Sequence, residues 1–151
     1  MAKPFKSAKF IDQVDDALDK GLARFLILTQ GKLSKNAPVD TGRMASSFFI
    51  SANTPSTEVP APQGTPSQYR NGVKVKQGVQ GPITVRQPTQ KITMENDWWI
   101  SSNLPYSERV AFDPKYAKGG RGGGSAWFTK IANGLNQDAE KAFSFFLKKI
   151  K

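Results

Sequence analysis

The sequence predicts an α+β domain in which an antiparallel sheet of about four strands packs against long N-terminal and C-terminal helices. Two segments with apolar residues every three or four positions, residues 8–35 and 125–150, predict the helices. The links between the strand-like segments are too short for crossover helices, so we expect antiparallel pairing. A length of 151 residues indicates one domain, residues 1–151, with loop excursions at 53–70 and 114–124.

The first predicted helix carries an apolar stripe and a polarised charge pattern. Acidic residues fill its first half and basic residues its second half, which complements the helix dipole. We interpret the four early aspartates as a solvated helix start rather than a metal site, because no second acidic cluster accompanies them. The stripe consists of Ile11, Val14, Leu18, Leu22, Phe25, Thr29 and Leu33.

The residues after this helix predict a helix stop and a chain reversal. Pro38 cannot donate a backbone hydrogen bond, so the helix should end before it. Asp40 or Thr41 can cap a backbone N–H in the turn, and Gly42 can adopt a positive φ. A strand is expected over residues 44–52.

The middle of the chain predicts a long Pro-rich loop followed by three short strands. Residues 53–67 contain four prolines and no apolar periodicity, which is typical of a long and mobile loop. Trp98 and Trp99 are neighbours in the last strand and should face opposite ways, which favours an interface role for Trp99 over base stacking. The three strands are expected at residues 72–76, 83–86 and 91–101.

The C-terminal third predicts a short helix at residues 104–110 with Pro105 in its first position, and a closing helix. Ser125 is the expected N-cap of the closing helix. Both long helices should pack on the same face of the sheet, burying Leu18, Leu22, Phe25, Phe128, Ile131 and Leu135.

Two features of this third could form contacts with other molecules. We interpret the glycine run around Arg121 as a connector rather than a phosphate cradle, because it lacks the context of a P-loop. The closing helix has more aromatic residues than one core face needs, which predicts a second apolar surface. The candidate interface residues are Trp99, Phe143, Phe145 and Arg121.

The composition excludes many kinds of chemistry. The chain has no cysteine and no histidine, which excludes thiol nucleophiles, disulfides and imidazole catalysis or ligation. No set of residues supports a reaction, so we expect no catalytic residue, cofactor or metal. No window is apolar enough for a membrane span, and the start lacks the apolar stretch of a signal peptide, so we expect a protein made in the cytoplasm.

Two motifs carry a resemblance to a known family. Residues 36–44, Asn-Ala-Pro-Val-Asp-Thr-Gly-Arg-Met, resemble the "aPvDTGrL" signature of the head–tail joining proteins of tailed bacteriophages, also called neck or tail-completion proteins. Residues 103–110 look like the second signature of that family, although Ser107 replaces its usual alanine. The residues that carry the resemblance are Pro38, Asp40, Thr41, Gly42, Arg43, Pro105 and Tyr106.

The resemblance implies a structural protein of the virion neck. Such a protein forms a homo-oligomeric ring, a hexamer or dodecamer, that joins the DNA-filled head to the tail and continues the DNA channel. The implied partners are portal, adaptor or head-closure proteins and tail proteins, with non-specific contact to channel DNA. On physical grounds alone the motif residues shape the fold, with Tyr106 expected to supply a buried ring.

The charge balance leaves one alternative open. Lysine and arginine number 22 against 12 acidic residues, a net charge of +10. Basic side chains that neutralise phosphates give affinity without sequence preference. The alternative is therefore a basic nucleic-acid-binding module that acts as a monomer.

Overall fold

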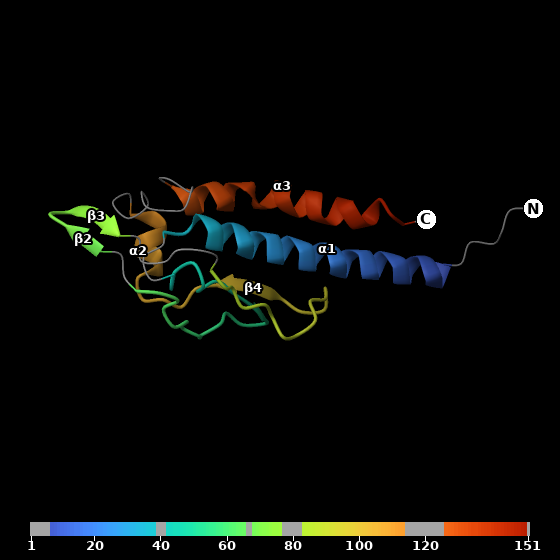
Figure 1. The fold of residues 1–151 in the computed structure, drawn as a ribbon. Coiled ribbons are helices and arrows are strands. Elements are labelled where there is room, and N and C mark those ends of the chain that lie inside the picture. Colours follow the sequence, from blue (N-terminus) through green and yellow to red (C-terminus); the bar gives the residue numbers. More distant parts are fainter. Residues whose placement is uncertain (1–6, 39–41, 66–67, 77–82, 114–125, 151) are drawn as a thin grey trace, which may run out of the picture.

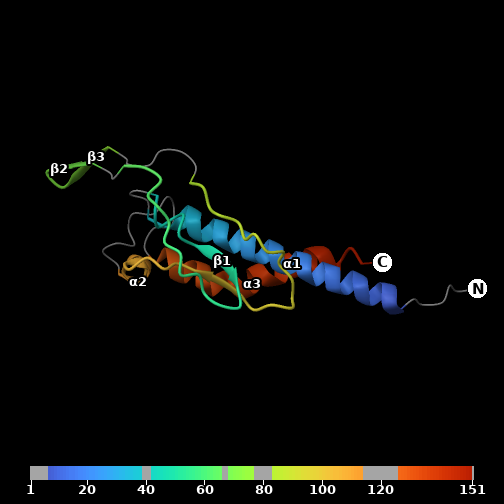
Figure 2. The same cartoon turned by 90° about the horizontal axis from the view of Figure 1, so that it is seen from below.

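The structure is a computed structural model that describes residues 7–38, 42–65, 68–76, 83–113 and 126–150. The antiparallel helices α1 and α3 lie side by side, and the sheet formed by β1 and β4 lies on the other side of α1 (Figures 1 and 2). The fold is thus a mixture of helices and antiparallel sheet with long N- and C-terminal helices, as predicted. The elements are α1 (Ser7–Asn36), β1 (Phe49–Ala52), β2 (Gln68–Arg70), β3 (Val73–Lys76), β4 (Trp98–Ser101), α2 (Ser107–Phe112) and α3 (Trp127–Leu147).

The layer order differs from the expected one: in Figure 1 α1 lies between α3 and the β1–β4 sheet, and only the start of α3 reaches the core cluster on which Ile100 of β4 packs. α1 packs along α3 on one side, and its Leu26 packs with Ile50 of β1 and with Ile92 on the other. A helix with apolar residues on two sides can be covered on both. The six residues expected to be buried on one sheet face are half-buried rather than buried: Leu18, Leu22, Phe25, Phe128, Ile131 and Leu135.

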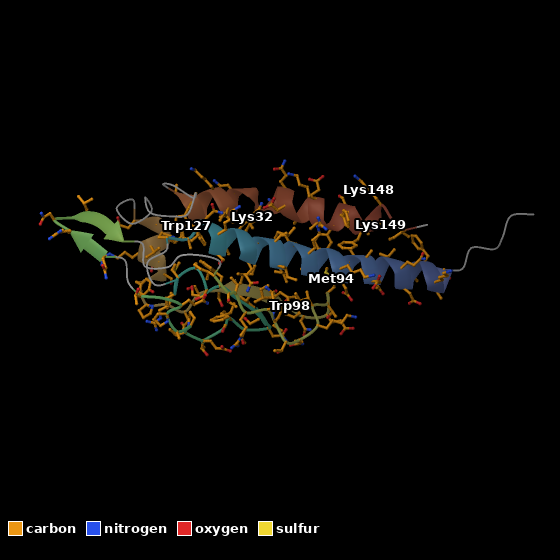
Figure 3. All side chains as sticks on the ribbon, viewed as in Figure 1. Lys32, Met94, Trp98, Trp127, Lys148 and Lys149 are labelled. Atoms are coloured by element: carbon orange, nitrogen blue, oxygen red, sulfur yellow. The ribbon has the colours of Figure 1, made fainter. Side chains whose placement is uncertain are left out.

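α1 and α3 approach each other closely at Gly21. A Cβ atom at this position would lie 2.6 Å from Cδ1 of Phe143 and 3.1 Å from its Cα. Farther along, Lys32 forms an ion pair with Asp138, and Figure 3 shows Lys32 on the side of α1 that faces α3. A residue without a side chain is thus needed at Gly21, where Phe143 of α3 lies against α1.

The described strands form two separate two-stranded sheets rather than one sheet of about four strands. β1 pairs with β4, with Phe49 opposite Ser101 and Ala52 opposite Trp98. β2 pairs with β3 in a hairpin, although β2 falls inside the segment expected to be a loop. The strand expected at residues 72–76 is confirmed as β3.

Residues 83–86, expected to be a strand, form none because side chains bind their backbone groups. The side-chain amide of Gln63 accepts from the N–H of Thr84 (2.9 Å) and donates to its carbonyl (2.7 Å). The carbonyl of Arg86 accepts from Nε2 of Gln30 (3.0 Å). Backbone groups satisfied in this way need no neighbouring strand.

Residues 91–97 also lie outside any strand, so only the end of the strand expected at 91–101 is present, as β4. The N–H of Met94 donates to Oδ1 of Asp19 in α1 (2.8 Å). The carbonyl of Thr93 accepts from Nε1 of Trp98 (2.8 Å). The first bond attaches the segment to α1, and the second closes the turn between Thr93 and Trp98. Figure 3 shows Met94 and Trp98 on the side of α1 where the β1–β4 sheet lies.

The strand expected over residues 44–52 begins only at Phe49. The N–H and the hydroxyl of Ser47 both donate to the carbonyl of Met44, at 3.1 and 2.7 Å. Serine side chains that bond the nearby backbone compete with strand pairing. Gly42 adopts a φ of 76°, which confirms the positive φ predicted for the reversal.

Both C-terminal helices begin differently from what the sequence predicts. α2 starts at Ser107, so Pro105 lies in the turn before it rather than in its first position. The residue before α3 is Ala126, which has a left-handed φ of 58° and caps no N–H with its side chain. The expected cap, Ser125, lies outside the described residues. Within the described part of the chain, no helix is long and apolar enough to cross a membrane.

Candidate functional site

The two motif segments, 60 residues apart in sequence, meet in one hydrophobic cluster. Ala37 and Met44 from the first segment pack with Leu104 from the second. Trp127 at the start of α3 completes the cluster and is only 1% exposed, with its ring edge-to-face against Phe48 at 6.2 Å between centroids. The motifs therefore set the junction between the end of α1, β1, α2 and the start of α3.

Polar residues of both motif segments also hold the same stretch of the Pro-rich loop. Nε of Arg43 donates to the carbonyl of Pro60 (2.8 Å). Nδ2 of Asn103 donates to the carbonyl of Thr57 (2.8 Å). This gives Arg43 a physical role that the sequence did not reveal: it ties the loop, residues 53–65, to the turn after α1.

An open apolar groove of about 500 Å³ lies beside this junction. Its walls come from α1, β4, α2 and the first half of α3. Thr29 lines it and is buried, and its hydroxyl has no hydrogen-bond partner among the described residues. The aromatic and large aliphatic lining residues include Phe25, Trp98, Ile100, Phe112, Phe128, Ile131 and Leu135.

The predicted interface residues lie in different parts of the fold. Trp99 is 46% exposed while Trp98 is half-buried, as their alternation in β4 predicts. Phe143 lies in the seam between α1 and α3, against Gly21. Phe145, two residues farther along α3, is 44% exposed.

Phe145 is an exposed ring between two cations. Cζ of Arg24 lies 4.3 Å from its centroid, and Nζ of Lys149 lies 4.0 Å away. Cation–π contacts of this kind hold the ring in place at the surface. Figure 3 shows Lys149 at the C-terminal end of α3, far from Trp127. Phe145 and the motif junction are therefore at opposite ends of the helix pair.

Of the remaining predicted residues, the structure describes some and leaves others out. Pro38 follows α1, whose last backbone bond is from the N–H of Ala37 to the carbonyl of Leu33 (2.9 Å), so the predicted helix stop is confirmed. Asp40, Thr41 and Arg121 lie outside the described residues. Tyr106, in the turn before α2, is 39% exposed, so the expectation of a buried ring is wrong.

The aspartates at the start of α1 have structural partners. Asp16 pairs with Lys20 at 2.7 Å, as their spacing predicts, and Asp19 accepts from the N–H of Met94. In the part of the chain that the structure describes, no three acidic side chains gather in a geometry that could hold a metal ion. These contacts explain Asp16 and Asp19 without a ligand.

Two structural features were not predicted from the sequence. Gln30 is buried in α1, and its Nε2 bonds to the carbonyls of Phe48 (2.7 Å) and Arg86 (3.0 Å), a role that no local pattern indicates. The β2–β3 hairpin did carry a signal. Asn71-Gly72 is the dipeptide typical of two-residue hairpin turns, and both residues have positive φ, 50° and 78°.

Comparisons of the chain with protein-family models, with curated proteins and with solved structures find no match.

Proposed function

We propose that the chain is a structural subunit of the neck of a tailed bacteriophage, which forms a ring between the DNA-filled head and the tail. The proposal is supported by one observation above all. The two segments that resemble the family signatures contribute to one hydrophobic cluster, through Ala37 and Leu104. They also hold the same loop, through hydrogen bonds from Arg43 and Asn103. Residues used in this way define a fold rather than a reaction.

A ring requires that one surface of each subunit fits a different surface of the next. We assign two surfaces to these contacts. The first is the open groove, whose apolar walls and unpartnered Thr29 hydroxyl a neighbour would cover. The second is the exposed ring of Trp99 on the face of the sheet. Portal, adaptor or head-closure proteins and tail proteins are the further partners that we propose for the assembled ring.

The proposal is tested by removing the chain from a phage that encodes it. A phage with a stop codon in this reading frame should produce filled heads and complete tails that do not join, as seen by electron microscopy of the lysate. Supplying the intact chain from a plasmid should restore joined particles. Normal infectious particles without the chain would contradict the proposal.

A further inference from the structure

Strand β4 separates the apolar groove from the outer face of the β1–β4 sheet. Trp98 and Ile100 of this strand line the groove. Trp99 lies between them and points to the opposite face, because successive side chains of a strand alternate. Its ring is 46% exposed. The ring of Trp99 therefore cannot enter the groove of its own chain, but it can enter the groove of another copy.

The groove combines apolar walls with a buried polar group that lacks a partner. Thr29 lines the groove and is 5% exposed, and its hydroxyl forms no hydrogen bond within the described residues. A matching occupant brings a large apolar surface and one polar group. The indole of a tryptophan has this composition, because its N–H is the only donor on an otherwise apolar double ring. In the described part of the chain, the indole N–H of Trp99 has no hydrogen-bond partner.

Other exposed aromatic rings fit the groove less well. Phe112 is itself part of the groove lining. Phe145 lies at the other end of the helix pair, where Arg24 and Lys149 already cover its ring. A phenylalanine ring also has no N–H or O–H that could bond to the Thr29 hydroxyl. Tryptophan is, in addition, among the residue types that most often dominate the binding energy of an interface.

We propose that Trp99 of one copy inserts into the groove of the next copy, between its β4 and its α3. This inference rests on the proposed ring, and it names the contact that joins neighbouring subunits. The groove is incomplete in a single chain, because the residue that fills it comes from the neighbour.

The position of Trp99 favours a closed ring over an open filament. Trp98 and Ile100 flank Trp99, so the groove wall and the inserting ring lie at the same level along β4. Figure 1 shows that β4 runs along α1. Parallel copies joined by this contact are therefore related by a rotation with little translation along the strand. A contact between two different surfaces closes into a ring when it repeats in this way.

The experiment uses two variants that break opposite sides of the contact. Trp99→Asp removes the inserting ring and leaves the groove intact. Ala132→Arg places a long charged side chain at an exposed position of the groove lining and leaves Trp99 intact. The matched controls are Val59→Asp, at an exposed apolar residue of the loop, and Asn133→Arg, at an exposed position of α3 outside the groove lining. Light scattering and native mass spectrometry measure the mass of each full chain, alone and in equimolar mixtures.

We expect the intact chain and both controls to form rings. Each test variant alone should need at least about thirtyfold more protein to assemble, which is the loss typical of a residue that dominates an interface. A mixture of the two test variants should form a dimer with one copy of each, because the groove of the first accepts Trp99 of the second. This dimer cannot grow, since both of its remaining surfaces carry a substitution.

Thermal melts check that the variants fold. Trp99→Thr, which suits a strand, replaces Trp99→Asp in the same mixtures if the latter does not fold.

Four results would overturn the inference. They are an intact chain that stays monomeric, test variants that assemble like the intact chain, controls that lose as much assembly as the test variants, and a mixture of the test variants that stays monomeric. Rings that persist in both test variants would overturn this contact and leave the neck function standing. A phage that makes normal particles without the chain would contradict the neck function alone, since the mixed dimer is measured on the purified chain.

Discussion

The helix pair and the strand-and-loop region of this protein are held together in different ways. α1 and α3 contact each other along their length, with Gly21 against Phe143 and the Lys32–Asp138 ion pair across the seam. Among the described residues from 42 to 103, the short β1–β4 sheet and the projecting hairpin are the only regular structure. Much of it is fastened by single side chains, such as Gln30 and Gln63, that bond to backbone groups far away in sequence.

The difference shows where stability should be concentrated. Periodic packing spreads the contact energy over many residues, so substitutions at the exposed positions of the helix pair should cost little. A buried side chain that alone satisfies distant carbonyl groups cannot be replaced without leaving those groups unpaired. We therefore expect a buried polar position such as Gln30 to be far more sensitive to substitution than the exposed polar positions of the helix pair.

The largest effect is expected for Gln30→Leu. This change leaves the buried carbonyl of Phe48 without its 2.7 Å partner and also frees the carbonyl of Arg86. We expect the free energy of unfolding to fall by about 2–4 kcal/mol in urea melts, because each unsatisfied buried group costs about 1–3 kcal/mol.

The matched control is Gln137→Leu on the exposed side of α3, which should change stability by less than about 0.5 kcal/mol. Equal destabilisation by the two variants would show that the bonds from Gln30 to the strand-and-loop region do not stabilise the fold.

Smaller effects, opposite in sign, are expected when two glycines of α1 are replaced by alanine. Gly21→Ala places a methyl group 3.1 Å from the Cα of Phe143, so the free energy of unfolding should fall by about 1–3 kcal/mol. Gly31→Ala meets nothing within 4 Å and should raise it by about 0.5–1 kcal/mol through helix propensity. Thermal melts of the two variants would measure the contrast, and a stabilising Gly21→Ala would show that the seam is not closely packed.

The parts of the fold that the sequence predicted share a physical origin. α1 and α3 follow from residues repeated every three or four positions, and the end of α1 follows from Pro38. The positive φ of Gly42 follows from local turn chemistry. Each of these depends on residues close together in the chain.

The predictions that were wrong concern features that depend on residues far apart in the chain. Residues 83–86 have the composition of a strand, but the side chain of Gln63 bonds both backbone groups of Thr84. Similarly, the exposed ring of Tyr106 depends on how the turn before α2 meets the body. Contacts between distant residues decide these features, and periodicity carries no information about them. The same holds for the apolar groove, which four elements form together.

The central claim, that this chain acts by assembly, is tested most directly by the mass of the purified chain. Mass measurement by light scattering and electron microscopy should be done over a range of protein concentrations, with and without the portal protein of the same phage. The account predicts rings of six or twelve copies around an open channel, and a Trp99→Asp variant that folds but assembles poorly. A chain that remains monomeric under all these conditions would contradict it.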